Sequence, residues 1–326
     1  MNALKDRLLK AVSTDIQAIE KALKENLHPY LSVVSHVADY LIAGGGKRIR
    51  PLLMVLSARL CGYKGRFDVT LSVVFEYLHV ATLLHDDIVD GAEKRRGYPV
   101  AHGIWGNPAS VLVGDYLLAR AINIAAQTGQ TSIIDVISRA TGHMSEGEIY
   151  QLLHRGDINL TEEQYMDIIG RKTACLIQAA CHTGALLAGA PEHRVAALAA
   201  YGNHLGYAFQ LIDDLLDYTA DPAVLGKSTG TDLKEGKMTL PLIYAMKQAG
   251  NKDHKHMESL IGTTESTTDQ FKATLKLVND YGGIAYTRNL AKEHLATAKS
   301  RLEMFDTSST RTILEDLADY VLTRQV

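Results

Sequence analysis

The stretch Ala81-Thr-Leu-Leu-His-Asp-Asp-Ile-Val-Asp90 places three aspartates at the end of an apolar run with helical spacing. On a helix that advances about 100° per residue, Asp86 and Asp90 lie on one face and Asp87 lies beside them. Three carboxylates at this spacing repel one another unless a cation lies between them. The stretch therefore predicts a long helix that ends at a cation site.

Two arginines and a second aspartate motif extend this prediction. Arg95 and Arg96 follow the first motif, and their guanidinium groups are suited to bind phosphate. A single D-D-x-x-D run could equally be a solvated helix end, but Asp213-Asp-Leu-Leu-Asp217 repeats the spacing after another apolar run. Two matched triplets beside phosphate-binding groups predict a metal-bridged phosphate site.

Composition argues against several other classes of protein. The net charge of -3 over 326 residues, with no basic runs, does not fit a nucleic-acid-binding protein. Cys61, Cys175 and Cys181 lack metal-ligand spacing and indicate a reducing, cytoplasmic setting. The N-terminal residues have mixed charge and do not resemble a secretory signal. Residues 174–191, the segment nearest to a membrane span, are expected to form a core helix, so we expect no transmembrane segment.

Helical spacing continues through most of the chain. No segment has the alternating, β-branched pattern of a strand, and no Gly/Ser or Pro linker divides the sequence. We expect a single all-α domain, residues 1–326, folded as one large helical bundle around a central cavity. The expected helices cover 4–27, a stretch ending at Gly44, 51–61, the run that holds the first aspartates, 109–128, 131–153, 161–189, 192–219 and several pieces from 240 onward, with loops at 99–108, 221–237 and 250–270.

A glycine-rich basic turn, Gly44-Gly-Gly-Lys-Arg-Ile-Arg-Pro51, is a second candidate for phosphate binding. Its glycines let the backbone approach a ligand closely, and Lys47, Arg48 and Arg50 supply cationic donors. Taken by itself, the turn would be explained as a helix stop followed by a solvated loop. Its interpretation as a ligand site therefore depends on the aspartate motifs.

A later segment, Leu225-Gly-Lys-Ser-Thr229, is similar to the end of a P-loop. Asp221 stands where the leading glycine is required, however, and no strand precedes it. We therefore expect no P-loop here. Lys227 and Lys237 remain candidates for lids over a phosphate or metal site.

Four further residues gain weight only from their neighbours. His79 lies two helical turns before the first aspartate motif, and Gln210 lies one turn before the second. Lys172 and Thr173 precede the uncharged segment. An isolated histidine at such a place is usually a satisfied core residue, and an isolated lysine usually reaches out to solvent.

The chemistry of these side chains favours Mg²⁺, which is held by one or two carboxylates and the phosphates of a substrate. Aspartate pairs that face each other across a helical cavity would hold several Mg²⁺ ions around a diphosphate. Those ions would neutralise charge on a departing diphosphate, and the apolar interior would shelter a carbocation from water. The sequence has no serine-hydrolase, reactive-cysteine or dinucleotide motif, and this reaction requires no protein nucleophile.

With these motifs the chain resembles the trans-isoprenyl diphosphate synthases, and within them the bacterial long-chain octaprenyl group. The resemblance extends from Gly44 to beyond Pro241 and rests on G-G-K-R-x-R-P, L-L-H-D-D-x-x-D followed by R-R-G, K-T, F-Q-L-x-D-D-x-x-D and the run from Gly226 to Pro241. It implies a homodimer that elongates farnesyl diphosphate, or another allylic diphosphate, by trans condensations with isopentenyl diphosphate. The implied product is octaprenyl diphosphate for a quinone side chain, with peripheral membrane contact for its release.

The resemblance also implies roles for individual residues. Mg²⁺ on the allylic diphosphate would be held by Asp86, Asp90 and Asp213, with Asp87, Asp214 and Asp217 in support. The diphosphate of isopentenyl diphosphate would be bound by Lys47, Arg50, His79 and Arg96. The allylic diphosphate would be bound by Arg95, Lys172, Thr173, Gln210, Lys227 and Lys237. The expected catalytic residues are Asp86, Asp90, Lys172 and Asp213.

Two small residues bear on the length of the product. Thr82 lies one turn beneath Asp86 on nearly the same face, and ideal geometry turns Ala81 aside. In the family, bulky side chains at these two positions form the floor of the pocket and stop growth early. Small side chains here imply a deep tunnel and a long product, while a shorter or other chain length, from geranylgeranyl to nonaprenyl, stays open.

Three other kinds of protein share part of this pattern. A non-catalytic partner subunit would be expected to lose one aspartate motif or the arginines, and a terpene cyclase would lack the duplicated site. A di-iron carboxylate bundle uses paired Glu-x-x-His, which occurs as Glu25–His28 and Glu76–His79. The first pair abuts Pro29, and no partner glutamates complete the set.

Overall fold

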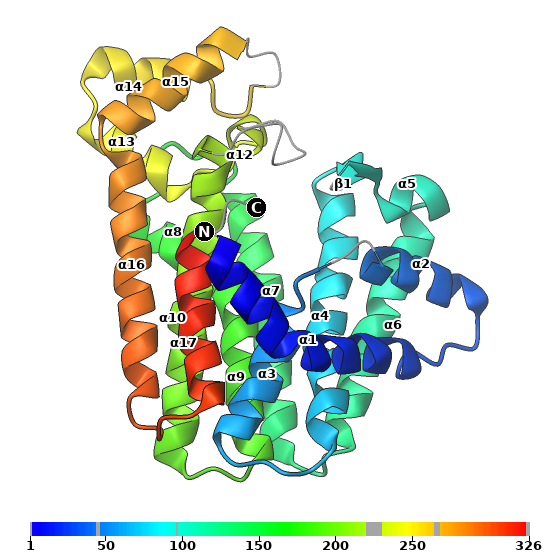
Figure 1. Ribbon diagram of the computed structural model, residues 1–326. Coiled ribbons are helices and arrows are strands. Elements are labelled where there is room, and N and C mark those ends of the chain that lie inside the picture. The colour runs from blue at the N-terminus through cyan, green and yellow to red at the C-terminus, as the bar shows by residue number, and fades with distance from the viewer. Residues whose placement is uncertain (1, 44–45, 96, 220–229, 264–267, 324–326) are drawn as a thin grey trace. The chain divides into compact units, whose positions relative to one another are not determined.

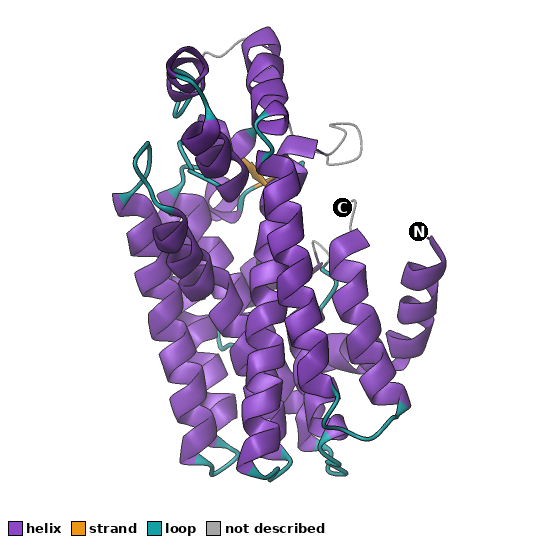
Figure 2. Cartoon of the chain, turned by 90° about the vertical axis from the view of Figure 1, so that its left-hand side faces the viewer, coloured by secondary structure: helices purple, strands orange, loops and turns teal. Residues whose placement is uncertain are grey.

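The computed structural model describes residues 2–43, 46–95, 97–219, 230–263 and 268–323, and most of them are helical (Figures 1 and 2). The prediction of an all-α fold is confirmed. The helices are α1 (Asn2–Glu25), α2 (Ser32–Ala43), α3 (Ile49–Leu60), α4 (Phe67–Val89), α5 (Ala101–Trp105), α6 (Asn107–Ala126), α7 (Thr131–Leu153), α8 (Glu162–Ile169), the π-helix η1 (Gly170–Ala174), α9 (Cys175–Leu187), α10 (Glu192–Thr219), α12 (Thr231–Lys234), α13 (Leu240–Gln248), α14 (Asn251–Glu258), α15 (Thr268–Asp280), α16 (Gly283–Leu302) and α17 (Ser309–Thr323).

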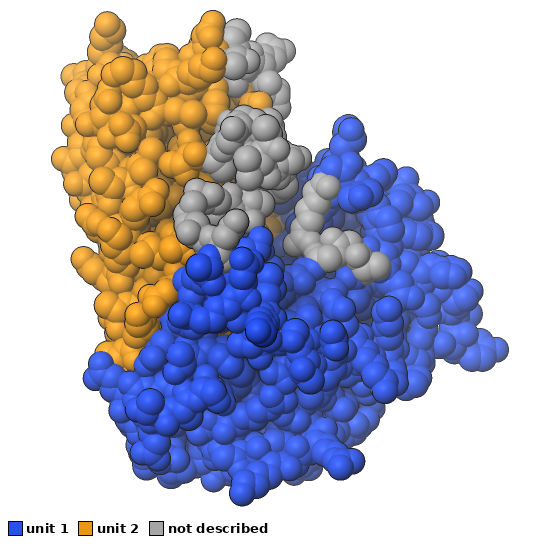
Figure 3. Space-filling view, in the orientation of Figure 1, with its two compact units in different colours: residues 1–141, 176–202, 302–316 blue, residues 142–175, 203–301, 317–326 orange. Residues whose placement is uncertain are grey.

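The chain divides into two compact units, each assembled from separate stretches of sequence (Figure 3). Unit 1 consists of residues 1–141, 176–202 and 302–316, and unit 2 consists of residues 142–175, 203–301 and 317–326. The first aspartate motif belongs to unit 1 and the second to unit 2. The prediction of a single domain stays a prediction.

In unit 1, α4 packs against α1, α3 and α6. Its side chains Phe75, Tyr77 and Leu78 are fully buried, and burial of each contributes roughly 1.5–3 kcal/mol. The Tyr77 hydroxyl donates to the carbonyl of Leu23 on α1 at 2.5 Å, so the buried phenol is also satisfied. The aspartates at the end of α4 therefore stand on a firmly packed element.

In unit 2, glycine allows helices to approach closely next to the second aspartate motif. A Cβ atom on Gly206 of α10 would lie 2.5 Å from Cα of Ala174, and one on Gly170 would lie 2.4 Å from the hydroxyl of Tyr207. The π-helix η1 carries one residue more per turn than an α-helix, and such insertions are frequent at functional sites. This close packing brings η1 and α10 together at the predicted Lys172-Thr173 motif.

One small sheet corrects the expectation that the chain contains no strand. Strands β1 (Lys94–Arg95) and β2 (Tyr98–Pro99) pair antiparallel. Gly97 takes a φ of 83°, which a tight hairpin turn requires and a side chain would disfavour. Strands of two residues are too short to show an alternating pattern, so the sequence did not reveal them.

All three predicted loops contain a helix. The short helices α5 and α12 lie within 99–108 and 221–237, and α14 lies within 250–270. Only Met257 of α14 is buried, so this helix carries almost no apolar stripe from which to predict it. Its place is fixed by packing on α13 and α15 and by the Tyr281 hydroxyl, which donates to Asp253 at 2.8 Å.

Within the described part of the chain, two helices have the length and composition of a membrane span, and neither of them is the segment 174–191 that the sequence indicated. Among the described residues, α4 and α6 are long and apolar enough to cross a membrane by length and composition alone. The apolar window of α4 is 67% buried and that of α6 is 39% buried, and the core helix of a globular protein passes the same test. Residues 174–191 do not form such a helix, because α9 has only 13 residues.

Candidate active site

The first aspartate motif lies at the C-terminal end of α4. The backbone N–H of Asp90 donates to the carbonyl of Asp86 at 2.8 Å, and Gly91, with a φ of 62°, ends the helix. Asp86 and Asp90 are half-buried, whereas Asp87 is only 3% exposed. The outer two carboxylates are therefore one turn apart on one face, as predicted.

The middle aspartate is held by the arginine of the hairpin. Nε of Arg95 donates to the two carboxylate oxygens of Asp87 at 3.0 and 3.1 Å, and its Nη2 donates to Oδ1 at 2.7 Å. Such a two-pronged, charge-assisted contact fixes both partners. A guanidinium has five N–H donors, so Arg95 can hold Asp87 and a phosphate together.

The three cations of the basic turn between α2 and α3 differ in their exposure to solvent. Lys47 is exposed and Arg50 is half-buried, but Arg48 is only 5% exposed. Arg48 was expected among the cationic donors; instead its Nη1 donates to Glu76 of α4 at 2.6 Å. His79, one turn further along α4, is half-buried.

The second aspartate motif shows the same division as the first. Asp213 is exposed, and Asp214 is 5% exposed with both oxygens engaged by the protein. The Tyr165 hydroxyl donates to Oδ2 of Asp214 at 2.5 Å, and the Gln210 amide donates to Oδ1 at 2.7 Å. In both motifs the middle carboxylate is thus an internal anchor, and the first aspartate is less buried.

The Lys172-Thr173 motif on η1 joins this network within unit 2. The Thr173 hydroxyl donates to Oε1 of Gln210 at 2.9 Å, and Gln210 in turn binds Asp214. Nζ of Lys172 donates to Gln151 of α7 at 2.7 Å and forms an ion pair with Glu148. Lys172 is therefore held by polar partners and does not extend freely to solvent.

The third aspartate of the second motif caps a short helix. The carboxylate of Asp217 accepts the backbone N–H groups of Thr231 and Asp232, at 3.2 and 3.1 Å, at the start of α12. Lys237, three residues after α12, forms an ion pair with Glu235 at 2.7 Å. Asp217 thus supports the segment that carries Lys237. Its predicted role in support of a Mg²⁺ site stays a prediction.

Crowded carboxylates shift the ionisation of this cluster. The pKa of Asp214 is raised to about 7, first by burial and then by the charges of Asp213 and Asp217, against the hydrogen bonds that it accepts. Burial, followed by the charges of Asp217 and Asp214, also raises the pKa of Asp232 well above its ordinary value. A cluster with this excess of negative charge is stabilised by a cation.

The residues present fit a magnesium ion that is shared with a substrate. Among the described residues, no three His, Cys, Asp or Glu side chains converge on a ready-made cation site. Mg²⁺ is commonly bound by only one or two carboxylates plus substrate phosphates. The carboxylates of the half-buried Asp86 and Asp90 and of the exposed Asp213 would supply such ligands, all of them oxygen donors.

The two predicted chain-length residues lie on α4 at different depths. Ala81 is fully buried, and Thr82 is half-buried with its hydroxyl donating to the carbonyl of His79 at 2.8 Å. Arg96 and Lys227, predicted to bind diphosphate, lie outside the described residues. Their roles stay predictions.

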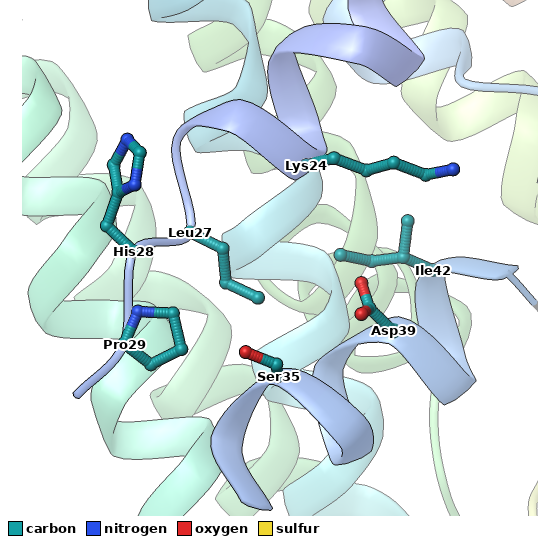
Figure 4. Close-up of a pocket in the computed structure, with 7 residues that line it drawn as sticks. All are labelled: Lys24, Leu27, His28, Pro29, Ser35, Asp39 and Ile42. Carbon is teal, nitrogen blue, oxygen red and sulfur yellow. The ribbon is translucent and has the colours of Figure 1, made fainter. Parts of the chain in front are cut away.

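A separate hollow in unit 1 contains none of the predicted site residues (Figure 4). It lies where α1 meets α2. Its lining residues are Lys24, Leu27, His28, Pro29, Ser35, Asp39 and Ile42.

Sequence reasoning missed residues that hold the site residues in place. They are Glu76, Glu148, Gln151 and Tyr165, each on a different element from the residue that it supports. Their signal is weak, because a polar residue on an amphipathic helix is ordinarily explained by solvent. Only the three-dimensional pairing distinguishes them.

Comparison with known proteins places this arrangement in a family. The polyprenyl synthetase family model matches residues 32–278. The octaprenyl diphosphate synthase of Escherichia coli is 38% identical over 319 residues, which cover 98% of each chain. The geranyl-diphosphate-specific all-trans-nonaprenyl-diphosphate synthase of Rhodobacter capsulatus is 36% identical over 98% of each chain.

A solved structure agrees with these sequence matches. The polyprenyl synthase of Caulobacter crescentus, crystallised with calcium and isoprenyl diphosphate, is similar at a TM-score of 0.93 and 40% identity over 98% of each chain. An all-α fold with two aspartate triplets and the basic motifs defines a class, the prenyltransferases of isoprenoid biosynthesis. The chain belongs to the polyprenyl synthetase family. Enzymes of this family use isoprenoid diphosphates and are typically metal-dependent.

Proposed function

We propose that this prenyltransferase elongates an allylic diphosphate, with farnesyl diphosphate as primer, by successive Mg²⁺-dependent trans condensations with isopentenyl diphosphate. The observation that carries the proposal is the division within each aspartate triplet. Asp87 and Asp214 are buried and bound by protein donors, while Asp86 is half-buried and Asp213 is exposed, as a carboxylate that binds a cation with the substrate would be.

The allylic diphosphate requires both cationic ligands and a fixed orientation. Mg²⁺, when bound, neutralises the charge that develops on the departing diphosphate. Asp86, Asp90 and Asp213 would hold the ions. Lys172 and Thr173 would bind the diphosphate from η1, where their partners already restrict their side chains.

Isopentenyl diphosphate would bind to the basic turn and α4. Lys47, Arg50 and His79 would hold its diphosphate, with Arg96 as a further cation. The C–O bond between the allylic carbon and its diphosphate breaks first, and the double bond of isopentenyl diphosphate then attacks the resulting carbocation to form the C–C bond. The proton then lost from the adduct would go to the released diphosphate, so no protein base is needed.

The product that we propose is octaprenyl diphosphate, made for a quinone side chain. Support comes from the small residues Ala81 and Thr82 and from the long-chain names of the two curated relatives. A shorter or longer product of the same family is the alternative outcome.

We further propose a cytoplasmic homodimer with peripheral membrane contact during product release. Helix α6 exposes Val111, Leu112 and Ile122, and an exposed apolar face of this kind commonly marks an association site. The thiols of Cys61, Cys175 and Cys181 are not joined in disulfides, which suits a reducing compartment. Light scattering, which measures the molar mass in solution, tests the dimer; we expect twice the mass of one chain.

The proposed metal role is tested by a titration that does not depend on turnover. Calorimetry would measure binding of a non-ionisable thiolo analogue of farnesyl diphosphate with Mg²⁺ and with EDTA. We expect affinity to fall by about 10²-fold or more without Mg²⁺, because uncompensated carboxylates then face the diphosphate. Equal affinity in both conditions would contradict the metal role.

A further inference from the structure

Unit 1 contains a buried ion pair beneath the basic turn. Arg48 and Glu76 have side chains that are 4% and 7% exposed, and Nη1 of Arg48 lies 2.6 Å from Oε1 of Glu76. Nη2 of Arg48 also donates to the carbonyl of Ile42 in α2 at 2.5 Å. Its Nε lies 3.8 Å from Glu20 of α1. One guanidinium thus connects α1, α2 and α4.

The backbone at Arg48 is unusual for a residue with a side chain. Its φ of 48° and ψ of 34° lie in the left-handed region, which costs roughly 1–2 kcal/mol for a residue other than glycine. Its carbonyl accepts the N–H of Leu52 at 3.0 Å, in the first turn of α3. This conformation turns the Arg48 side chain into the protein, while Lys47 stays exposed.

Gly46 shows how closely the turn lies over the ion pair. A Cβ atom at this position would lie 2.9 Å from Nη1 of Arg48 and 3.5 Å from Oε1 of Glu76. The first contact is closer than real Cβ atoms normally tolerate. The backbone of the turn therefore rests on the ion pair, and a single methyl group would displace one or the other.

Each member of the ion pair lies close in sequence to groups that are proposed to bind isopentenyl diphosphate. Lys47 precedes Arg48 and Arg50 follows it by two residues, while Glu76 lies one helical turn before His79 on α4. We infer that Arg48, through Glu76, is a positioning residue that fixes Lys47 and Arg50 in register with His79 for the diphosphate of isopentenyl diphosphate. This inference rests on the proposed function.

A purely structural role is the competing explanation, and the chain offers a matched control. Arg59 of α3 contacts Asp68, a buried carboxylate two turns earlier on α4 than Glu76, at 3.4 Å. It also contacts Asp15 of α1 at 2.6 Å. This second pair again links neighbouring helices to α4, but no predicted ligand group adjoins it.

The test compares two variants of the positioning pair with the control. Glu76→Gln removes the buried counter-charge of Arg48 and leaves only the exposed Glu20 at 3.8 Å, and Gly46→Ala disturbs the pair without changing any charge. Asp68→Asn is the control. We expect the KM for isopentenyl diphosphate to rise about tenfold or more in the first two, with kcat and the KM for farnesyl diphosphate changed less than about threefold.

A double variant separates positioning from stability. Arg48→Met/Glu76→Leu replaces the buried pair with apolar side chains, which commonly restores stability. We expect its Tm to return towards the parent value while the KM for isopentenyl diphosphate stays raised. A parent-like KM in the double variant, or an equal rise in Asp68→Asn, would overturn the inference.

Lys47→Ala distinguishes this inference from the proposed function. If the parent protein incorporates no isopentenyl diphosphate, or Lys47→Ala leaves its KM unchanged, the proposed assignment of the basic turn fails. If Lys47→Ala raises that KM but Glu76→Gln and Gly46→Ala do not, only the positioning role fails.

Discussion

At the residue scale, aspartates of identical chemistry have different tasks because their surroundings differ. Asp87 and Asp214 are buried, and donors within the protein occupy their oxygens. A buried carboxylate without such donors would be strongly destabilising. Asp213, in contrast, is exposed.

Paired substitutions in the second motif separate these tasks. Asp213→Asn is expected to lower kcat by about 10²-fold or more and leave Tm unchanged. The substitution removes a carboxylate that is proposed to hold the Mg²⁺ that neutralises the departing diphosphate. Asp214→Asn turns an amide N–H towards the donor of Tyr165 or Gln210 and is expected to cost about 1–3 kcal/mol in stability. Steady-state kinetics and thermal unfolding measure the two effects, and the reverse pattern would contradict the division.

At the element scale, the approach of α7 to η1 controls Lys172. A Cβ atom on Gly147 of α7 would lie 2.6 Å from the backbone nitrogen of Lys172, whereas one on Gly142, also in α7, would meet nothing within 4 Å. A substitution at Gly147 must therefore push η1 away. Gly142 is a control on the same helix.

Two glycine variants test this contact. Gly147→Ala is expected to raise the KM for the allylic diphosphate by about tenfold or more, because it displaces Lys172 from its ligand position. Gly142→Ala is expected to leave that KM unchanged and to stabilise the helix by about 0.5–1 kcal/mol. A similar effect of both substitutions on the KM would show that η1 is not positioned by this contact.

Helix α4 also carries the proposed floor of the product cavity. Ala81→Phe is expected to shorten the product, because a ring replaces a methyl group at a fully buried position. It should also lower stability by about 1–3 kcal/mol through overpacking. Leu83→Phe, a smaller change at a half-buried position of the same helix, is the control.

Chromatography of the labelled products gives the chain-length distribution of each variant. An unchanged distribution in a folded Ala81→Phe protein would place the floor elsewhere. Equal shortening in Leu83→Phe would show that the effect is not specific to Ala81.

At the scale of the whole molecule, a half-buried histidine pair links stability to pH. Nδ1 of His204 on α10 lies 3.0 Å from Nδ1 of His294 on α16, so one nitrogen must donate and the other accept. Burial and the neighbouring His204 lower the pKa of His294 to about 4, and burial and Arg301 lower that of His204. The folded protein therefore binds fewer protons here than the unfolded chain does.

This pair predicts a loss of stability in acid. Stability should be intact above about pH 6.5, where the unfolded histidines are neutral, and should fall as the pH drops towards 4. Between pH 7.5 and 5 we expect His294→Gln to lose about 1 kcal/mol less than the parent, after allowance for partial exposure. Urea unfolding at pH 7.5 and at pH 5 measures this difference in the free energy of unfolding, and His193→Gln, at an exposed histidine, is the control. An identical pH dependence in the parent and both variants would contradict the account.

Much of this molecule could be predicted from its sequence, because long amphipathic helices have a strong periodic signal. The helices 131–153 and 192–219 have their predicted bounds, and the family follows from motifs that the comparisons confirm. The hairpin at Lys94–Pro99 and helix α14 could not be predicted, because the first is too short and the second has too little apolar surface.

Contacts between residues that are far apart in the sequence could not be predicted either. The sequence suggested Arg48 as one of three cations for a ligand, yet it is paired with Glu76, 28 positions later in the chain. Tyr165 and Asp214 are likewise 49 positions apart. Long-range pairing of this kind depends on how helices pack, and helical spacing alone does not determine it.

The most direct test of the central claim is incubation of the parent protein with Mg²⁺, farnesyl diphosphate and labelled isopentenyl diphosphate, followed by chain-length analysis. We predict incorporation of label into a long-chain, octaprenyl product, dependent on Mg²⁺ and lost in Asp86→Ala protein of unchanged helicity. Well-folded parent protein that incorporates no label into any prenyl diphosphate would contradict the proposed reaction.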